Sequence, residues 1–145
     1  MAAFVKFHTF VEALAEGKHD FSSDSLKVAL TNTAPTHATD TVFDPTGVHP
    51  PPTEAHGYAP TVAVLVASEQ TAGVYELSLE NVVFTAAGGT IGPFRYAILY
   101  NDNAPNTELI GYFDYGAVPS GGLILQVGET FTVDFETVGT VLTIE

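Results

Sequence analysis

One stretch, residues 82–116, constrains the fold of this chain most. It contains the densest run of aromatic and β-branched residues, VVFTAAGGTIGPFRYAILYNDNAPNTELIGYFDYG. Glycine and proline pairs separate residues 82–85 from residues 94–100, and an asparagine-rich turn at 101–106 precedes residues 109–115. The pattern predicts a meander of three antiparallel strands.

The middle strand of this meander alternates with a period of two. One predicted face carries Phe94, Tyr96, Ile98 and Tyr100, and the other carries Arg95, Ala97 and Leu99. Large apolar groups on one side and small or mixed ones on the other are expected for a strand in the centre of a sheet.

A short helix is predicted near the N-terminus, over residues 7–16. Phe7, Phe10, Val11 and Leu14 fall at i, i+3, i+4 and i+7, which places them on one helical stripe. Gly17 suits the left-handed conformation that ends a helix. Because so short a helix is marginal alone, we expect it to pack on the sheet or on a neighbouring subunit.

The remaining strands are short and regularly spaced. They are expected at residues 26–31, 61–68, 75–80, 123–127, 130–136 and 140–144, about eight to nine strands with the meander. The 145 residues fit one domain. The fold class predicted is mainly all-β, an antiparallel β-sandwich or jelly-roll-like domain with one N-terminal helix.

A long connection over residues 32–60 interrupts this spacing. It has six prolines, three of them adjacent at Pro50, Pro51 and Pro52, and few aliphatic residues. Adjacent prolines are extended and stiff and cannot donate to a ladder. We interpret the segment as an extended arm that lies on a partner; a surface loop is the alternative.

Charge restricts the partners. Four Lys and Arg residues against 17 Asp and Glu give a formal net charge of −13, which repels nucleic acid and anionic membranes. A basic or apolar protein surface is compatible with this charge, and so is a role in solubility alone. No targeting segment is recognised, and the longest aliphatic run, residues 62–67, is far shorter than a membrane helix.

The sequence has only weak matches to motifs for ligand binding, metal binding or catalysis. The glycine-rich run 86–92 lacks the Lys-Ser/Thr ending of a phosphate loop and is interpreted as a turn. His37, His49, Glu54 and His56 match no zinc pattern. Without a catalytic signature or a cysteine, the sequence predicts no enzyme, no cofactor and no metal site.

Two sets of acidic residues are also candidate sites. Asp102 and Glu108, with the asparagines between 101 and 106, could supply oxygen ligands to calcium, but a hairpin turn explains them better. Asp134 and Glu136 resemble a catalytic carboxylate pair, but their alternation predicts a hydrated strand face.

Arg95 is the only arginine of the chain. Since bulky apolar residues flank it, a buried guanidinium there would need a carboxylate partner. Asp114, on the neighbouring predicted strand, is the first choice, and the role expected is structural, within the chain or across a subunit interface.

Two segments carry a resemblance to a known group of proteins. KFHTFVEALAEGKHDFSSDSLKVALTNTAP, residues 6–35, and IGPFRYAILYNDNAPNTELIGYFDYG, residues 91–116, resemble small virion structural proteins of tailed bacteriophages, and among these most resemble capsid decoration, or cement, proteins. The chain departs from that pattern in residues 42–60, where its proline and histidine content is its own.

The resemblance implies a β-rich module, often a homotrimer, made in the host cytoplasm and bound to the major capsid protein on the capsid exterior of the virion. The residues expected to contact partners are Phe7, Phe10, His49, Pro50, Pro51, Pro52, His56 and Arg95. One alternative is a tail, neck or baseplate component. Another is a receptor- or glycan-binding module that stacks sugars on the tyrosines Tyr58, Tyr75, Tyr96, Tyr100, Tyr112 and Tyr115.

Overall fold

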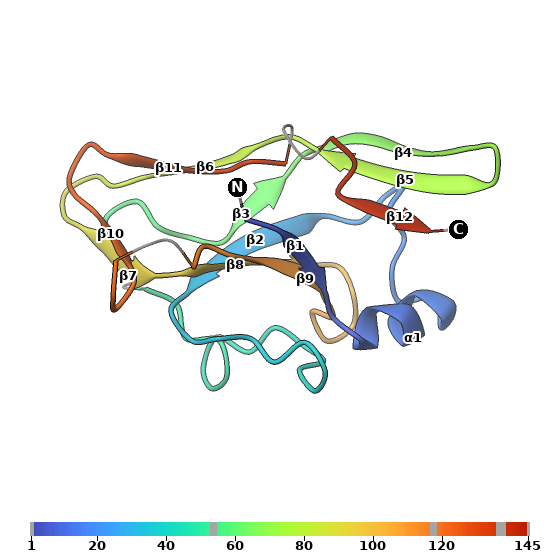
Figure 1. Cartoon of the computed structure of the whole chain (residues 1–145), viewed down its shortest axis with the longest axis horizontal. Coiled ribbons are helices and arrows are strands. Elements are labelled where there is room, and N and C mark those ends of the chain that lie inside the picture. The colour runs from blue at the N-terminus through green and yellow to red at the C-terminus, as the bar shows by residue number, and fades with distance from the viewer. Residues whose placement is uncertain (1, 53–54, 117–118, 136–138, 145) are drawn as a thin grey trace.

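A computed structural model describes residues 2–52, 55–116, 119–135 and 139–144. Its strands form two layers, with one helix and a long connection beneath the lower layer (Figure 1). The lower layer is a five-stranded antiparallel sheet in the order β1-β9-β8-β2-β3. Its strands are β1 (Phe4–Lys6), β9 (Leu109–Asp114), β8 (Tyr96–Asn101), β2 (Leu26–Thr31) and β3 (Thr61–Ala63).

The upper layer consists of smaller antiparallel sheets. A three-stranded sheet has the order β12-β5-β4 and one pair is β11-β6, whereas the pair β10-β7 lies at one end of the two layers (Figure 1). Their bounds are β12 (Leu142–Ile144), β5 (Val74–Leu79), β4 (Leu65–Thr71), β11 (Thr130–Val133), β6 (Val82–Thr85), β10 (Leu123–Leu125) and β7 (Ile91–Phe94). The predicted antiparallel, mainly β fold is confirmed as a sandwich-like arrangement, whereas these sheet orders do not establish a jelly roll.

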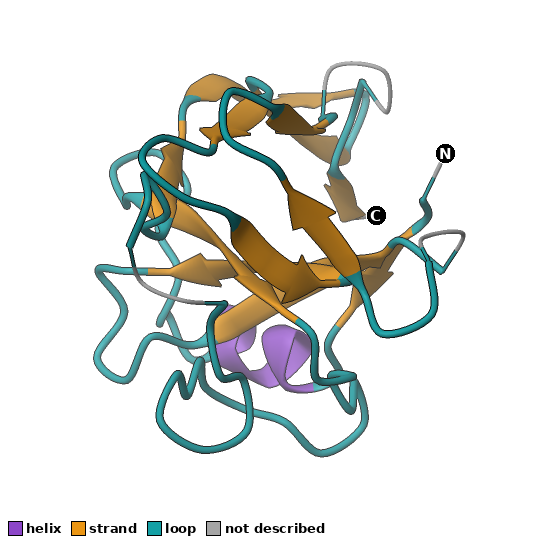
Figure 2. Cartoon of the chain, turned by 90° about the vertical axis from the view of Figure 1, so that its left-hand side faces the viewer, coloured by secondary structure: helices purple, strands orange, loops and turns teal. Residues whose placement is uncertain are grey.

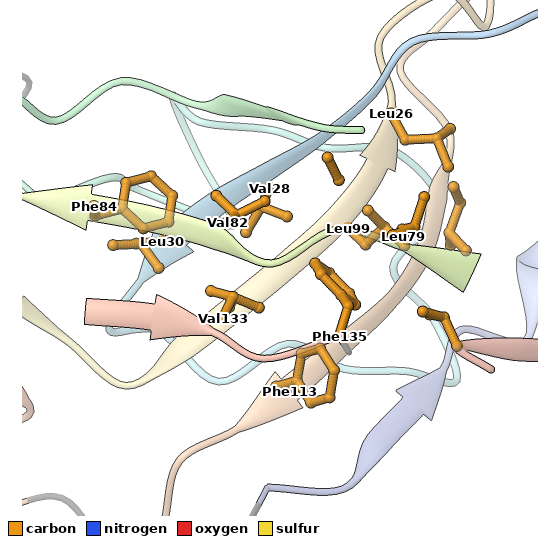
Figure 3. Packing of buried hydrophobic residues seen from close by; sticks show 14 of the residues in the cluster. Leu26, Val28, Leu30, Leu79, Val82, Phe84, Leu99, Phe113, Val133 and Phe135 are labelled. Atoms are coloured by element: carbon orange, nitrogen blue, oxygen red, sulfur yellow. The ribbon is translucent and has the colours of Figure 1, made fainter. Parts of the chain in front are cut away.

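The main hydrophobic core lies between the two layers. Leu26, Val28 and Leu30 of β2 and Leu99 of β8 point toward side chains of the upper layer (Figure 3). The upper layer contributes Leu79, Val82, Phe84, Val133 and Phe135, each 2 % exposed or less. The inward alternation predicted for Val133 and Phe135 is confirmed.

The predicted meander is correct in one half. β8 lies at the centre of its sheet, between β9 and β2, as the alternation predicted. β6 does not join it, because β6 pairs with β11 in the other layer. The predicted strand is interrupted at Arg95, between β7 and β8. Phe94 therefore belongs to the main core, while Tyr96 faces the opposite side of the five-stranded sheet.

A second predicted strand, residues 61–68, is also divided. β3 pairs with β2, and β4 pairs with β5 in the other layer. Val64 is the residue between them, so the chain crosses from one layer to the other there. These two divisions and β1, a strand that the sequence did not predict, raise the number of described strands to twelve, above the eight to nine predicted.

The helix α1 (Thr9–Ala15) is confirmed and ends where the sequence predicted. Gly17 has φ +72°, its N–H donates to the Leu14 carbonyl at 3.1 Å, and the Lys18 N–H donates to the Ala13 carbonyl at 2.9 Å. This pair of bonds is a Schellman motif. Figure 2 shows the helix below the strands, among loops.

The predicted apolar stripe of this helix needs two corrections. Phe7 lies before the first helical residue, Thr9, and is therefore not part of the stripe. Phe10 and Ala13 are buried, but Val11 is 56 % exposed. The helix therefore packs on the sheet with a face centred on Phe10 and Ala13, and Val11 lies at its solvent side.

Candidate partner-binding surface

The five-stranded sheet is buried on both faces. On the side away from the main core, a second cluster is formed by Phe7, Ala29, Tyr96, Ile98, Tyr100, Leu109 and Tyr112, all 8 % exposed or less. Five of the six residues of β2 are likewise buried. Something must therefore cover this second face.

The connection over residues 32–60 provides that cover. The Phe43 ring stacks on Tyr100 with 4.3 Å between ring centroids and 13° between planes. The Phe43 N–H donates to the Thr107 carbonyl at 2.9 Å, and the Leu109 N–H donates to the Thr41 carbonyl at 3.2 Å. The connection is thus joined by its backbone to the loop between β8 and β9.

His49 fixes the fold of the connection from within. Its side chain is fully buried and its ring stacks beside Phe43, with 6.0 Å between centroids. Nδ1 accepts the Asp44 N–H at 3.2 Å, which leaves Nε2 as the donor to Asp40 Oδ2 at 3.1 Å. Both ring nitrogens are therefore engaged inside the chain.

Asp44 begins the turn that leads to His49. Its carboxylate accepts the Thr46 hydroxyl at 2.9 Å and the N–H groups of Thr46 and Gly47. The Thr46 hydroxyl is the main reason why the pKa of Asp44 lies below its ordinary value, and the backbone donors add to it. A charged Asp44 therefore stabilises this turn.

The prediction of an extended arm is wrong for the described part of this segment. The Thr31 hydroxyl donates to the Pro50 carbonyl at 2.8 Å, Pro50 is exposed, Pro51 is half-buried and Pro52 is buried. The physical reason is the aromatic outer face of β8, which the connection removes from water. Glu54, considered as a zinc ligand, lies outside the described residues.

The predicted partner residues accordingly fall into two sets. Phe7, Phe10 and His49 are at most 1 % exposed, so the chain itself uses these side chains for packing. His56 is exposed, and its Nδ1 lies 3.1 Å from the Thr90 carbonyl oxygen. Arg95, Pro50 and His56 are therefore the predicted residues that a partner can reach most directly.

Arg95 and Asp114 form the ion pair that the sequence predicted. Arg95 Nε donates to Asp114 Oδ1 at 2.8 Å and Nη2 donates to Oδ2 at 3.1 Å. The two side chains are 41 % and 40 % exposed, so the pair lies at the surface. Hydrogen bonding to Asp114 raises the pKa of Arg95 further.

The surface carries nearly all of the acidic charge. Of the 17 Asp and Glu residues, Glu54, Glu136 and Glu145 lie outside the described part, and of the others only Glu108 is buried. Lys18 pairs with Glu16 at 3.0 Å and Lys27 with Asp102 at 2.9 Å. With Arg95 also paired, the cations are mostly neutralised within the chain and the carboxylates dominate the surface.

The residues weighed as calcium ligands build a hairpin turn instead. The Asn101 side-chain oxygen accepts the N–H groups of Asn103 and Ala104, and Glu108 accepts the Asn106 N–H at 3.0 Å. In the described ranges no three His, Asp or Glu side chains are grouped closely enough to hold a metal ion. The glycine-rich run 86–92 connects β6 to β7 as a turn.

Sequence reasoning missed a buried polar cluster behind this turn. The Asn101 amide donates to Asp24 Oδ2 at 2.6 Å and contacts His19 Nδ1 at 3.1 Å. His19 is 7 % exposed and lies against Phe10 and Phe21, and its Nε2 has no hydrogen-bond partner among the described residues. Burial is the main reason why the pKa of His19 is lowered. No local motif marks it, because its partners are distant in sequence.

The tyrosines are mostly internal. Tyr58, Tyr96, Tyr100 and Tyr112 are 4 to 8 % exposed. Burial raises the pKa of Tyr100 to about 12. These rings therefore pack in the two clusters and do not form an exposed stacking platform.

Comparisons with known proteins identified no relative of this chain. No protein-family model matches the chain, and neither the curated proteins nor the solved structures gave a significant match. In the part of the chain that the structure describes, no helix is long and apolar enough to cross a membrane.

Proposed function

We propose that this chain is a non-enzymatic structural protein that binds the outer surface of an assembled phage capsid and stabilises it. The observation that carries the proposal is the charge distribution of the sandwich. Three of its four lysine and arginine side chains are paired with carboxylates of the same chain, while most of its carboxylates are at the surface. Such a surface is repelled by packaged DNA and suits the exterior of a DNA-filled shell.

The resemblance of residues 6–35 and 91–116 to decoration proteins supports the same role. Stabilisation requires only that the protein bind the assembled shell better than its free subunits. Weak contacts repeated by the symmetry of a shell then add to a large effect. Pro50, His56 and Arg95 are the exposed residues proposed to take part, and the internal tyrosines favour this role over glycan stacking.

The test is the copy number of this chain in purified virions, measured by quantitative mass spectrometry against the major capsid protein. Hundreds of copies, in a simple ratio to the capsid protein, are expected. A few to tens of copies would instead favour the alternative, a component of the tail, neck or baseplate. Absence from the particle would refute both structural roles.

A further inference from the structure

β3 and β4 follow each other in the chain, and each is the last strand of its own sheet. Among the described strands, one side of each therefore has no neighbour. In the part of the chain that the structure describes, nine large hydrophobic residues are exposed, and four of them lie here: Val62 at 46 %, Val64 at 50 %, Leu65 at 40 % and Val66 at 60 %. We call residues 61–68 the valine edge.

The valine edge lacks the charges and prolines that protect many edge strands. Natural proteins place charges or prolines on such strands to prevent pairing with other chains. Residues 61–68 read TVAVLVAS, without a charge or a proline, although the chain has a net charge of −13. By contrast, the other edge of the five-stranded sheet, β1, carries Lys6. An edge left open in this way is suited to pairing.

We propose that the valine edge is the contact between two copies of this chain, related by a twofold axis and paired antiparallel about Leu65. The sequence around Leu65 reads the same in both directions: Val64 corresponds to Val66 and Ala63 to Ala67. In an antiparallel pair centred on Leu65, valine thus meets valine and alanine meets alanine. Such side-chain pairs are the unit of sheet stabilisation.

The local charges permit a second copy in this orientation. Glu69 is the first charged residue after the edge, and antiparallel pairing about Leu65 places Thr61, not another Glu69, opposite it. Elsewhere two copies repel each other through their carboxylates. A basic partner would be attracted to those carboxylates and gains nothing from an uncharged edge.

The β4–β5 ladder leaves Val66 available for this contact. The register shifts between Leu65 and Ala67, which pair with Leu79 and Ser78, so Val66 has no Cα partner on β5. Val66 is also the most exposed of the four apolar residues. A bulge of this kind re-aims a side chain away from the sheet.

This inference does not rest on the proposed function. The resemblance implies three copies, whereas one edge that pairs with itself closes with two. A monomeric protein that decorates shells would overturn the inference alone, and a dimer that is absent from virions would overturn the function alone.

The first experiment is sedimentation velocity of the full chain between about 1 and 200 μM. A concentration-dependent dimer is expected. V64K and V66K should be monomeric, because each would place a charged lysine opposite a valine of the other copy on both sides of the twofold axis. The matched controls are V11K and V127K, at positions 56 % and 64 % exposed, which should dimerise like the wild type. Circular dichroism checks that all four variants fold.

The second experiment uses the absence of cysteine from the chain. The variant L65C should form a disulfide-linked dimer on mild oxidation, since Leu65 faces its own copy, and V127C should form far less. A wild type that stays monomeric at 200 μM, a trimer, or V64K and V66K variants that dimerise normally would overturn the proposal. Equal cross-linking of L65C and V127C would overturn the pairing about Leu65.

Discussion

Arg95 and Asp114 face each other at the start of β8 and the end of β9, joined by two hydrogen bonds of 2.8 and 3.1 Å. The chain holds the pair in place by its backbone, because the Tyr115 N–H donates to the Arg95 carbonyl at 3.1 Å. The Arg95 guanidinium also lies 5.2 Å from the centre of the Tyr96 ring. The only arginine of the chain thus connects the beginning of β8 to the end of β9, and its side chain is exposed enough to contact a partner.

Replacement of Arg95 should have a small effect on stability. Both partners are about 40 % exposed, and water screens the attraction between exposed charges. We therefore expect Arg95→Ala to lower the free energy of unfolding in urea only slightly. A double-mutant cycle with Asp114→Ala isolates the coupling between the two side chains. If the effects of the two substitutions on the free energy of unfolding are additive, the two side chains do not interact in solution.

Phe43 should be important for stability although it lies in an irregular segment. Phe43→Ala removes the ring that stacks on Tyr100 and uncovers the second cluster, so we expect a loss of about 2 to 4 kcal/mol in the free energy of unfolding. Val48→Ala is the control, because Val48 lies in the same segment and is 45 % exposed. Equal, small effects of both changes would mean that the connection does not cover the sheet.

His19 should make the fold sensitive to mild acid. Burial lowers its pKa in the folded protein below the usual 6.5, with Glu108 and Asp24 opposing the shift in part and Lys18 adding to it. Below about pH 6.5 the unfolded chain therefore binds a proton that the folded chain resists, and the free energy of unfolding falls until the pH reaches the lowered pKa. Above the usual value the contribution of His19 is constant.

The measurement compares the wild type with His19→Phe, which keeps an aromatic ring beside Phe10 and Phe21. The difference between their free energies of unfolding should be constant from pH 7 to 8 and change as the pH falls from 6.5 to 5. Parallel curves over the whole range would show that His19 is protonated equally well in both states.

Tyr100 should resist ionisation. Burial raises its pKa from 10 to about 12, and Asp102 adds to the shift. Absorbance at 295 nm should show a late step near pH 12 that Tyr100→Phe removes. Because the pKa of Tyr100 is raised in the folded protein, the free energy of unfolding should fall as the pH rises above 10, where only the unfolded chain releases this proton. The control is the protein in concentrated urea, in which the late step should disappear.

The sequence by itself determined the features that depend on neighbouring residues. Two-residue alternation placed β8 at the centre of a sheet, and Gly17 ended the helix, because backbone conformation is a local property. The pairing of Arg95 with Asp114 could also be predicted, since Arg95 directly precedes β8, Asp114 ends the neighbouring strand β9, and the chain has no other arginine.

Only the tertiary structure decided which layer each strand joins and what covers the outer face of β8. The division at Val64, the pairing of β6 with β11 and the burial of His49 depend on contacts between residues far apart in the chain. A period of two shows that a strand has two faces, but it does not show what lies on either. That is why a proline-rich segment predicted to reach for a partner is instead folded over its own sheet, while the apolar valine edge remains exposed.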